Sequence, residues 1–235
     1  MSALSSRVEF EAPGWFGKLV LLGDFAHRRL PHHFVNTCDR WLSDGIAASR
    51  RQLGGQWLDT YLSGPVWRFA WAEGVLDTRW WFGVMMPSVD AVGRYFPLVV
   101  AFARQAPPIS AADLSTLDHW YGQAGAAALG TLLPGATLES FEAELLRCTM
   151  TEDGPTPAAA GVHTAPSQGP ERFVLAGADS LSAWAQVLTA PPFFRRYAGH
   201  SFWWPMQVQN DDNSMTVVPG LPDPTQFTSM LEGRW

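Results

Sequence analysis

Apolar positions along the chain follow two patterns, continuous runs and helical spacing, and each predicts a different element. Residues 15–22 form a nearly continuous apolar run, which is typical of a strand with both faces covered. From Pro31 to about Leu53, apolar side chains recur three or four residues apart, which predicts one face of an amphipathic helix. Pro31 suits the start of this helix because the first helical N–H groups have no partner within the helix.

A short helix and three strands are predicted next. The helix ends at Gly64-Pro65 and is expected to bury four side chains, Trp57, Leu58, Tyr61 and Leu62. The strands are expected over residues 66–72, 80–86 and 95–103. Because the loops between these consecutive strands are short, we expect an antiparallel meander.

Adjacent tryptophans occur twice within predicted strands, at Trp80-Trp81 and at Trp203-Trp204. Neighbouring residues of a strand face opposite sides of the sheet. We therefore expect each pair to place one side chain on each face, with both faces buried.

The second half of the chain predicts two longer helices and then shorter elements. The helices are expected over residues 110–129 and 138–147. Residues 151–170 are rich in Pro, Gly, Ser and Ala and predict a mobile loop, and residues 1–13 predict a loose tail. After the loop, strands are expected at 172–176, 201–206 and 214–218, and helices at 180–188 and 224–231. Asp223 is the expected N-cap of the last helix.

These elements indicate an α/β protein of the α+β type, with a mixed, largely antiparallel central sheet and helices on its faces. Residues 171–235 are too few to form a mixed domain comfortably on their own. We therefore expect them to pack onto the sheet of residues 14–150, giving one domain over residues 1–235. A doubly wound nucleotide-binding fold would need regular βαβ alternation and a Gly-rich first turn, and the sequence has neither.

Composition and charge narrow the function classes. Of the 235 residues, 47% are apolar and 16% are charged, which excludes a disordered chain. A net charge of −6 argues against nucleic-acid binding. The bases are Lys18 and 15 arginines, which are spread widely and form no polybasic anchor for anionic lipid. The first residues contain no apolar leader, and the longest apolar run, residues 96–103, is too short to cross a bilayer. We expect a soluble, cytoplasmic protein in which Cys38 and Cys148 are free thiols.

Motifs for a cofactor or a metal ion are absent from the sequence. No phosphate-binding loop surrounds Lys18, and no dinucleotide fingerprint is present, so no cofactor is expected. Histidines and acids do gather in one segment, at Asp24, His27, His32, His33 and Asp39. Their spacing matches no common metal motif, and adjacent histidines at a helix start are more often hydrated than ligating.

A serine hydrolase is the enzymatic alternative. Ser88 is followed by Asp90 but lacks the flanking glycines of a nucleophile elbow. His119 or His200 would have to complete a triad by the way the chain folds. The alternative reading is thus a small hydrolase or ligand-sensing enzyme that uses Asp24, Ser88 and a histidine.

Two polar segments follow apolar strands, Gly23-Asp24-Phe25 and residues 87–97. If the first strand and the meander share one sheet, the two segments lie at the same edge. Asp24 or Asp90 can then pair with Arg94, and a bidentate pair would fix the two loops together. The candidate residues for such a structural clamp, or for a rim that binds a partner, are Asp24, Phe25, Ser88, Asp90 and Arg94.

Several motifs occur in a recognisable order along the chain. They are WFGKL at 15–19 with GDF at 23–25, WL and YLSGPVWRF within 57–69, GVMMPSVD at 83–90 with VGRYFPL at 92–98, and SFWW at 201–204. In this order and spacing they resemble the TagF family, also called ImpM, of type VI secretion-associated proteins.

The resemblance implies a cytoplasmic accessory protein of the bacterial type VI secretion system, and not an enzyme. Members of this family are similar in role to post-translational repressors that act on assembly or firing of the apparatus. The expected partner is a secretion component, above all the forkhead-associated scaffold protein Fha. The family supplies no catalytic residues, so Asp24, Ser88, Asp90 and Arg94 are implied only as structural or contact residues.

Overall fold

Eight strands form one sheet in the computed structural model of the chain, which describes residues 12–108, 111–148, 150, 169–174, 196–206 and 214–235. The strands are β1 (Gly14–Gly17), β2 (Ala26–Arg28), β3 (Trp67–Trp71), β4 (Trp80–Met86), β5 (Leu98–Arg104), β6 (Glu171–Val174), β7 (His200–Pro205) and β8 (Ser214–Pro219). Their order across the sheet is β2-β1-β5-β4-β3-β7-β8-β6. The strands β3, β4 and β5 form the expected meander, and β7, β8 and β6 extend the same sheet beyond β3.

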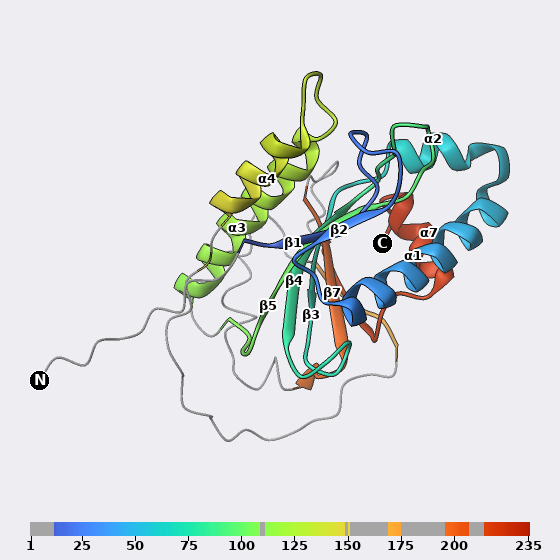
Figure 1. Cartoon of the computed structure of the whole chain (residues 1–235). Helices are drawn as coiled ribbons and strands as arrows, with labels where there is room; N and C mark the ends of the chain where they lie inside the picture. The colour runs from blue at the N-terminus through green and yellow to red at the C-terminus, as the bar shows by residue number, and fades with distance from the viewer. Residues whose placement is uncertain (1–11, 109–110, 149, 151–168, 175–195, 207–213) are drawn as a thin grey trace, which may run out of the picture.

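Helices cover both faces of this sheet (Figure 1). They are α1 (His32–Leu53), α2 (Trp57–Leu62), α3 (Ala111–Gly130), α4 (Leu138–Arg147) and α7 (Pro224–Leu231), with a 3-10 turn, η1 (Gly54–Gln56), between α1 and α2. One core cluster joins the sheet to α3 and α4, and the other joins it to α1, α2 and α7. The α+β class is therefore confirmed, and among the described strands the sheet is antiparallel throughout rather than mixed.

Most of the predicted elements are confirmed within a few residues. The helix predicted from Pro31 begins at His32, and the helices predicted at 138–147 and 224–231 have those bounds. Asp223 caps α7 as expected, since its carboxylate accepts hydrogen bonds from the backbone N–H groups of Thr225 and Gln226, each at 2.8 Å. The predicted tail up to residue 11, residues 151–168 of the predicted loop, and the helix predicted at 180–188 lie outside the described residues.

The strand predicted over residues 15–22 is wrong in its second half, because β1 ends at Gly17. Gly17 has φ 134°, and a Cβ atom there would lie 2.0 Å from the Pro97 carbonyl oxygen. After this close approach the chain turns, and Leu22 donates its N–H to the Leu19 carbonyl. It then returns as β2, a three-residue strand too short and too polar for its sequence pattern to reveal.

The two tryptophan pairs divide between the faces as predicted. Trp80 and Trp204 lie in the core cluster under α3 and α4, whereas Trp81 and Trp203 lie in the cluster under α1 and α7. All four are buried. The sheet is thus apolar on both faces in its centre, which is why its strands read as continuous apolar runs.

The expectation that α2 buries four side chains is wrong for Leu58 and Leu62, which are 38% and 57% exposed. Trp57 and Tyr61 lie four residues apart on one face of this six-residue helix. Their rings stack 4.9 Å apart and occupy the face of the helix that packs against the core. The leucines are each one position further round the helix, about 100° away, and they project beyond this contact.

Candidate functional site

Two loops meet at one end of the sheet, residues 18–25 between β1 and β2 and residues 87–97 between β4 and β5. Both β1 and β4 pair antiparallel with β5, so they run in the same direction and end on the same side. The loops are joined by a backbone hydrogen bond of 2.8 Å from the Ala91 N–H to the Leu22 carbonyl. The sequence-based expectation that these polar segments share one edge is therefore confirmed.

Asp90 is the centre of this loop cluster. Its Oδ2 accepts hydrogen bonds from Lys18 Nζ and from Arg94 Nε, both at 2.7 Å, and its Oδ1 accepts from the N–H groups of Val92 and Arg94 at 3.1 and 2.8 Å. Burial acts to raise the pKa of Asp90, but the hydrogen bonds from Lys18, Arg94 and Val92 outweigh it and hold the pKa well below its usual range. Asp90 is therefore an anion that ties its own loop together and joins it to the end of β1.

Arg94 extends the cluster from the buried Asp90 to the surface. Its Nη2 donates to the Gly23 carbonyl at 2.5 Å and lies 3.3 Å from Asp24 Oδ1. The Arg94 side chain is half exposed, and the Asp24 side chain is largely exposed. One guanidinium thus joins both loops, through a buried acid on one and through a backbone carbonyl and an exposed acid on the other.

Ser88 lies beneath this cluster and is fully hydrogen-bonded. Its Oγ donates to the Lys18 carbonyl at 2.7 Å. Tyr61 donates its hydroxyl to the Ser88 carbonyl at 2.9 Å and accepts from the Ser88 N–H at 3.0 Å. Among the described residues no hydrogen bond joins Ser88 to a histidine, and His200 Nδ1 lies 3.0 Å from the Ala198 carbonyl oxygen. Ser88 therefore has a structural place between the two loops, and its hydroxyl is engaged with a backbone carbonyl.

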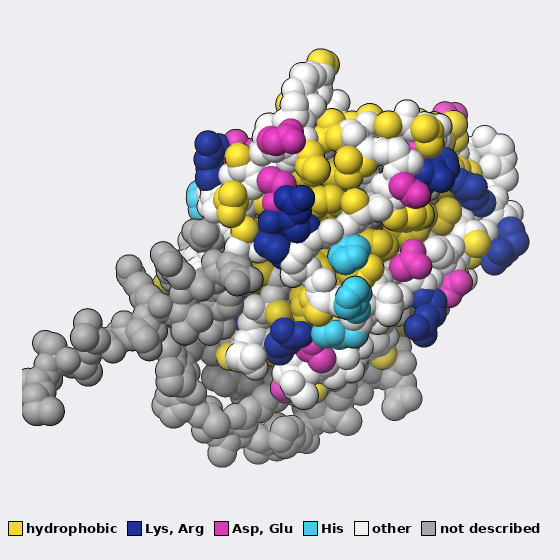
Figure 2. All heavy atoms as spheres, in the orientation of Figure 1, with side chains coloured by type: hydrophobic (Ala, Val, Ile, Leu, Met, Phe, Trp, Pro, Cys, Tyr) yellow, Lys and Arg dark blue, Asp and Glu magenta, His cyan; other side chains and the backbone are white. Residues whose placement is uncertain are grey.

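Phe25 provides an apolar surface beside the ionic groups. It is 46% exposed, its ring meets Phe96 edge-on at 4.7 Å, and it stacks on Phe16 at 6.2 Å. Lys18 Nζ lies 4.6 Å from the centre of the same ring. Together with the exposed Val20 and Val92, Phe25 leaves hydrophobic atoms at the surface of this end, and Figure 2 shows such atoms across the upper part of the molecule.

The exposed part of the cluster is called the loop rim below. It consists of Val20, Asp24, Phe25, Val92 and Arg94. Sequence reasoning singled out Asp24, Phe25 and Arg94 but missed Lys18 and Tyr61, which fix the loops from beneath. The available signal was that the only lysine of the chain lies within an apolar run, where a charge requires a partner.

The histidines of the segment around the start of α1 are divided between two separate contacts. The rings of His27 and His32 are 6.0 Å apart, while His33 Nε2 lies 3.0 Å from Asp77 Oδ2. In the described part of the chain, no group of three or more His, Cys, Asp or Glu side chains is placed to hold a metal ion. Nor does any described helix have the length and apolar character needed to cross a membrane.

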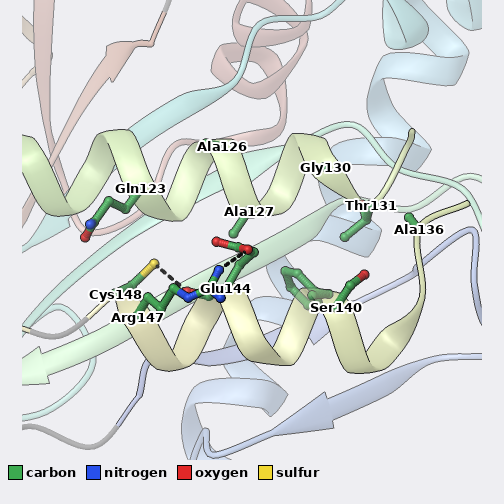
Figure 3. A pocket seen from close by; sticks show the side chains of 11 residues that line it. Gln123, Ala126, Ala127, Gly130, Thr131, Ala136, Ser140, Glu144, Arg147 and Cys148 are labelled. Carbon is green, nitrogen blue, oxygen red and sulfur yellow. Dashed lines mark hydrogen bonds and ion pairs between the residues drawn. The ribbon is translucent and has the colours of Figure 1, made fainter. Parts of the chain in front are cut away.

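A separate cavity of about 400 Å³ lies between α3 and α4 (Figure 3). Small residues of α3, including Ala126, Ala127 and Gly130, form one wall, and an ion pair between Glu144 and Arg147 lies on the facing side. Burial and the nearby Glu144 raise the pKa of the Cys148 thiol at its end to about 11. The thiol is therefore protonated at neutral pH and does not supply a reactive thiolate.

Comparisons with known proteins agree with this architecture. Residues 14–148 match the model of the TagF N-terminal domain, described as type VI secretion system-associated. The crystal structure of PA0076 from Pseudomonas aeruginosa PAO1 is similar over 94% of both chains, with 35% sequence identity and a TM-score of 0.67. No curated protein matched the chain. The chain therefore belongs to the TagF family of type VI secretion-associated proteins.

Proposed function

We propose that this protein is a cytoplasmic accessory protein that represses type VI secretion after translation, by binding a component of the apparatus. The expected partner is the forkhead-associated scaffold protein Fha. Membership of the TagF family supports the link to type VI secretion. The observation that carries a binding role is the loop rim, which combines exposed apolar and charged side chains with a rigid buried support.

Rigidity supports binding because a surface that is already ordered loses less conformational entropy when a partner docks. The loop rim is held by Asp90, whose carboxylate accepts four hydrogen bonds, and by Tyr61 beneath Ser88. Phe25 is then an aromatic group of the kind enriched at protein interfaces, with Asp24 and Arg94 as its charged border.

The enzymatic alternative has less support. A serine nucleophile needs a base within hydrogen-bonding distance, and the Ser88 hydroxyl instead donates to a backbone carbonyl. The polar groups of the cluster are engaged with one another, which is the arrangement expected of a structural support. Binding without turnover is therefore the function we propose.

The test is capture of the partner from host cytosol by tagged protein, read by mass spectrometry. Val92→Glu and Asp24→Arg change the exposed part of the rim and leave its buried bonds in place. Leu133→Glu is the matched control, because Leu133 is as exposed as Val92, at 66% against 67%, and lies in the turn after α3. Circular dichroism establishes that each variant is folded.

We expect wild type and Leu133→Glu to recover Fha equally, and both rim variants to recover at least tenfold less. In cells, the rim variants should fail to restore repression in a strain that lacks the protein, so secretion stays high. Equal recovery by all four proteins would overturn the assignment of the rim. Failure of the wild-type protein to enrich any secretion component would overturn the proposed function.

A further inference from the structure

The outer edge of β2 is unpaired within the described sheet. β2 is the first strand in the sheet order and pairs only with β1. His27 and Arg28 are exposed, and Ala26 is half-buried. Residues of an antiparallel strand direct their N–H and C=O groups alternately to one neighbour and to the other. At least one residue of β2 therefore directs both groups away from β1, where no described strand pairs with them, and such an edge is the template used when a peptide adds to a sheet.

A histidine and an arginine lie on the two sides of this edge, His27 on one and Arg28 on the other. In the β1–β2 register His27 is opposite Phe16, which belongs to the core under α1, and Arg28 is opposite Trp15, which belongs to the core under α3 and α4. His27 therefore projects toward the α1 face, where its ring contacts His32, and Arg28 projects toward the α4 face. A strand added to β2 would meet a basic side chain on either face.

The described arginines around β2 and the start of α1 outnumber the acids that pair with them. Glu142 pairs with Arg29 at 2.6 Å and lies 3.5 Å from Arg28, so one acid faces two arginines. Asp77 pairs with Arg79 at 2.6 Å and with His33 at 3.0 Å. Among these described groups, one arginine charge is left over. Histidines gather in the middle of the face in Figure 2, with Lys or Arg side chains next to them.

The start of α1 adds to this field. Its N-cap is Pro31, which has no side chain able to accept a hydrogen bond, and its first turn contains no acid. The N-terminal end of a 22-residue helix carries a partial positive charge that is usually met by such groups. Here His32 and His33 occupy the first turn, so a negative group supplied from outside would be favoured beside β2.

A second copy of this chain does not fit the edge. Antiparallel pairing of two β2 strands would place either the two His27 or the two Arg28 side chains opposite each other, and it would bring no acid to the edge. Short, charged edge strands protect proteins against such self-association. The complementary occupant is an extended segment that carries acidic side chains.

We propose that the outer edge of β2 binds an extended acidic segment of a partner protein, which joins the sheet as a further strand. The inference rests on the proposed function only in that the chain acts by binding a protein. The inference goes further in two respects. It names the chemistry of the bound segment, and it places the binding site at β2, next to Phe25 of the loop rim.

The first test uses synthetic probes in place of the partner. Three labelled eight-residue peptides alternate threonine with glutamate, glutamine or lysine, and binding to the full chain is followed by fluorescence anisotropy at low salt. We expect the glutamate peptide to bind at least tenfold more tightly than the glutamine peptide, and the lysine peptide not to bind. Equal affinity for the glutamate and glutamine peptides would overturn the acidic specificity.

Backbone methylation distinguishes strand addition from simple charge attraction. Two further glutamate peptides carry N-methyl groups on alternate residues, one on the threonines and one on the glutamates. Only one edge of an added strand faces β2, so one methylated peptide should lose binding and the other should keep it. Full binding by both would overturn the strand-addition model.

Charge-reversal variants of the protein test whether the peptide binds at β2. Alternate residues of an added strand share one face, so the glutamates meet either Arg28 or His27. One of the variants Arg28→Glu and His27→Glu should therefore weaken the glutamate peptide at least tenfold, whereas Arg40→Glu, an exposed position further along α1, should change it less than twofold. Equal losses in all three folded variants would overturn the site. Because the probes contain no secretion protein, peptide binding without capture of any secretion component would overturn the proposed function alone. Capture of a component without peptide binding would overturn this inference alone.

Discussion

Lys18 Nζ lies 2.7 Å from Asp90 Oδ2, and both side chains are buried. The two residues are 72 positions apart, so this contact joins the end of β1 to the loop between β4 and β5. Lys18 is also the only lysine in the chain, and its carbonyl accepts the hydrogen bond from Ser88 Oγ. One residue thus supports both the ionic and the neutral part of the loop cluster.

Lys18→Met should destabilise the protein, because Asp90 loses one partner while it stays buried. Asp90→Asn in the same chain should recover part of the loss, since no uncompensated carboxylate remains. Urea unfolding of wild type, both single variants and the double variant gives the coupling between the two sites. Strict additivity of the two substitutions would show that the pair contributes nothing as a pair.

Stability should fall as the pH drops below about 4, the range in which free carboxylates titrate. Burial acts to raise the pKa values of Asp77 and Asp90, but hydrogen bonds from their partners outweigh it and hold both pKa values well below the usual range. Both groups therefore bind protons more readily in the unfolded chain, so their stabilisation is present above the unfolded pKa and is lost on acidification.

The same experiment has an internal control. Urea midpoints measured at pH 7, 5 and 3.5 should decline less steeply for Asp77→Asn than for wild type. Asp59→Asn, at an exposed position on α2, should decline as wild type does. A parallel decline in all three proteins would exclude Asp77 as a source of the acid sensitivity.

Gly17→Ala should cost at least about 2 kcal/mol of unfolding free energy. The substitution adds a Cβ atom 2.0 Å from the Pro97 carbonyl at a residue whose φ is 134°. Gly23→Ala is the control, because a Cβ atom there has no heavy atom within 4 Å, and it should change stability by less than about 0.5 kcal/mol. Chemical denaturation measures both values, and similar effects at the two positions would contradict the close approach.

Asp223→Ala should cost about 1 kcal/mol, because two N–H groups at the start of α7 lose their acceptor. Thr137→Ala at the start of α4 removes one such bond, at 3.1 Å, and should cost no more. Thermal unfolding of wild type and of the two variants measures the loss of stability at each cap. A larger effect at Thr137 would contradict the order that the caps predict.

Both cysteines should resist thiol reagents in the native protein at pH 7. Burial raises the pKa of Cys38 well above its usual value and that of Cys148 to about 11, and nearby acids add to both shifts. Neither thiol therefore supplies the reactive thiolate. A disulfide-exchange reagent should label both cysteines fully when the chain is unfolded in 6 M guanidinium chloride. Without the denaturant it should label neither cysteine within minutes. Fast labelling of the native chain would contradict the burial of the two thiols.

Much of the fold was predictable from the sequence because local patterns suffice for it. Apolar spacing gave α1, and the continuous runs gave β3, β4 and β5, since a sheet covered on both faces needs apolar residues at every position. The cap at Asp223 follows from its side chain and from the proline after it. Adjacent tryptophans in a strand must face opposite sides, so their division between the two cores follows as well.

The remaining features depend on contacts between residues far apart in the chain. β2 is a strand only because Gly17 turns the chain back and β1 supplies its partner, and Leu58 and Leu62 are exposed only because Trp57 and Tyr61 already fill the space beneath α2. The sequence indicated that Asp24, Asp90 and Arg94 can pair. Tertiary structure alone decided that Lys18 joins Asp90 and that β2, with Arg28, forms the outer strand of the described sheet beside Phe25, because burial and long-range pairing depend on how the whole sheet closes.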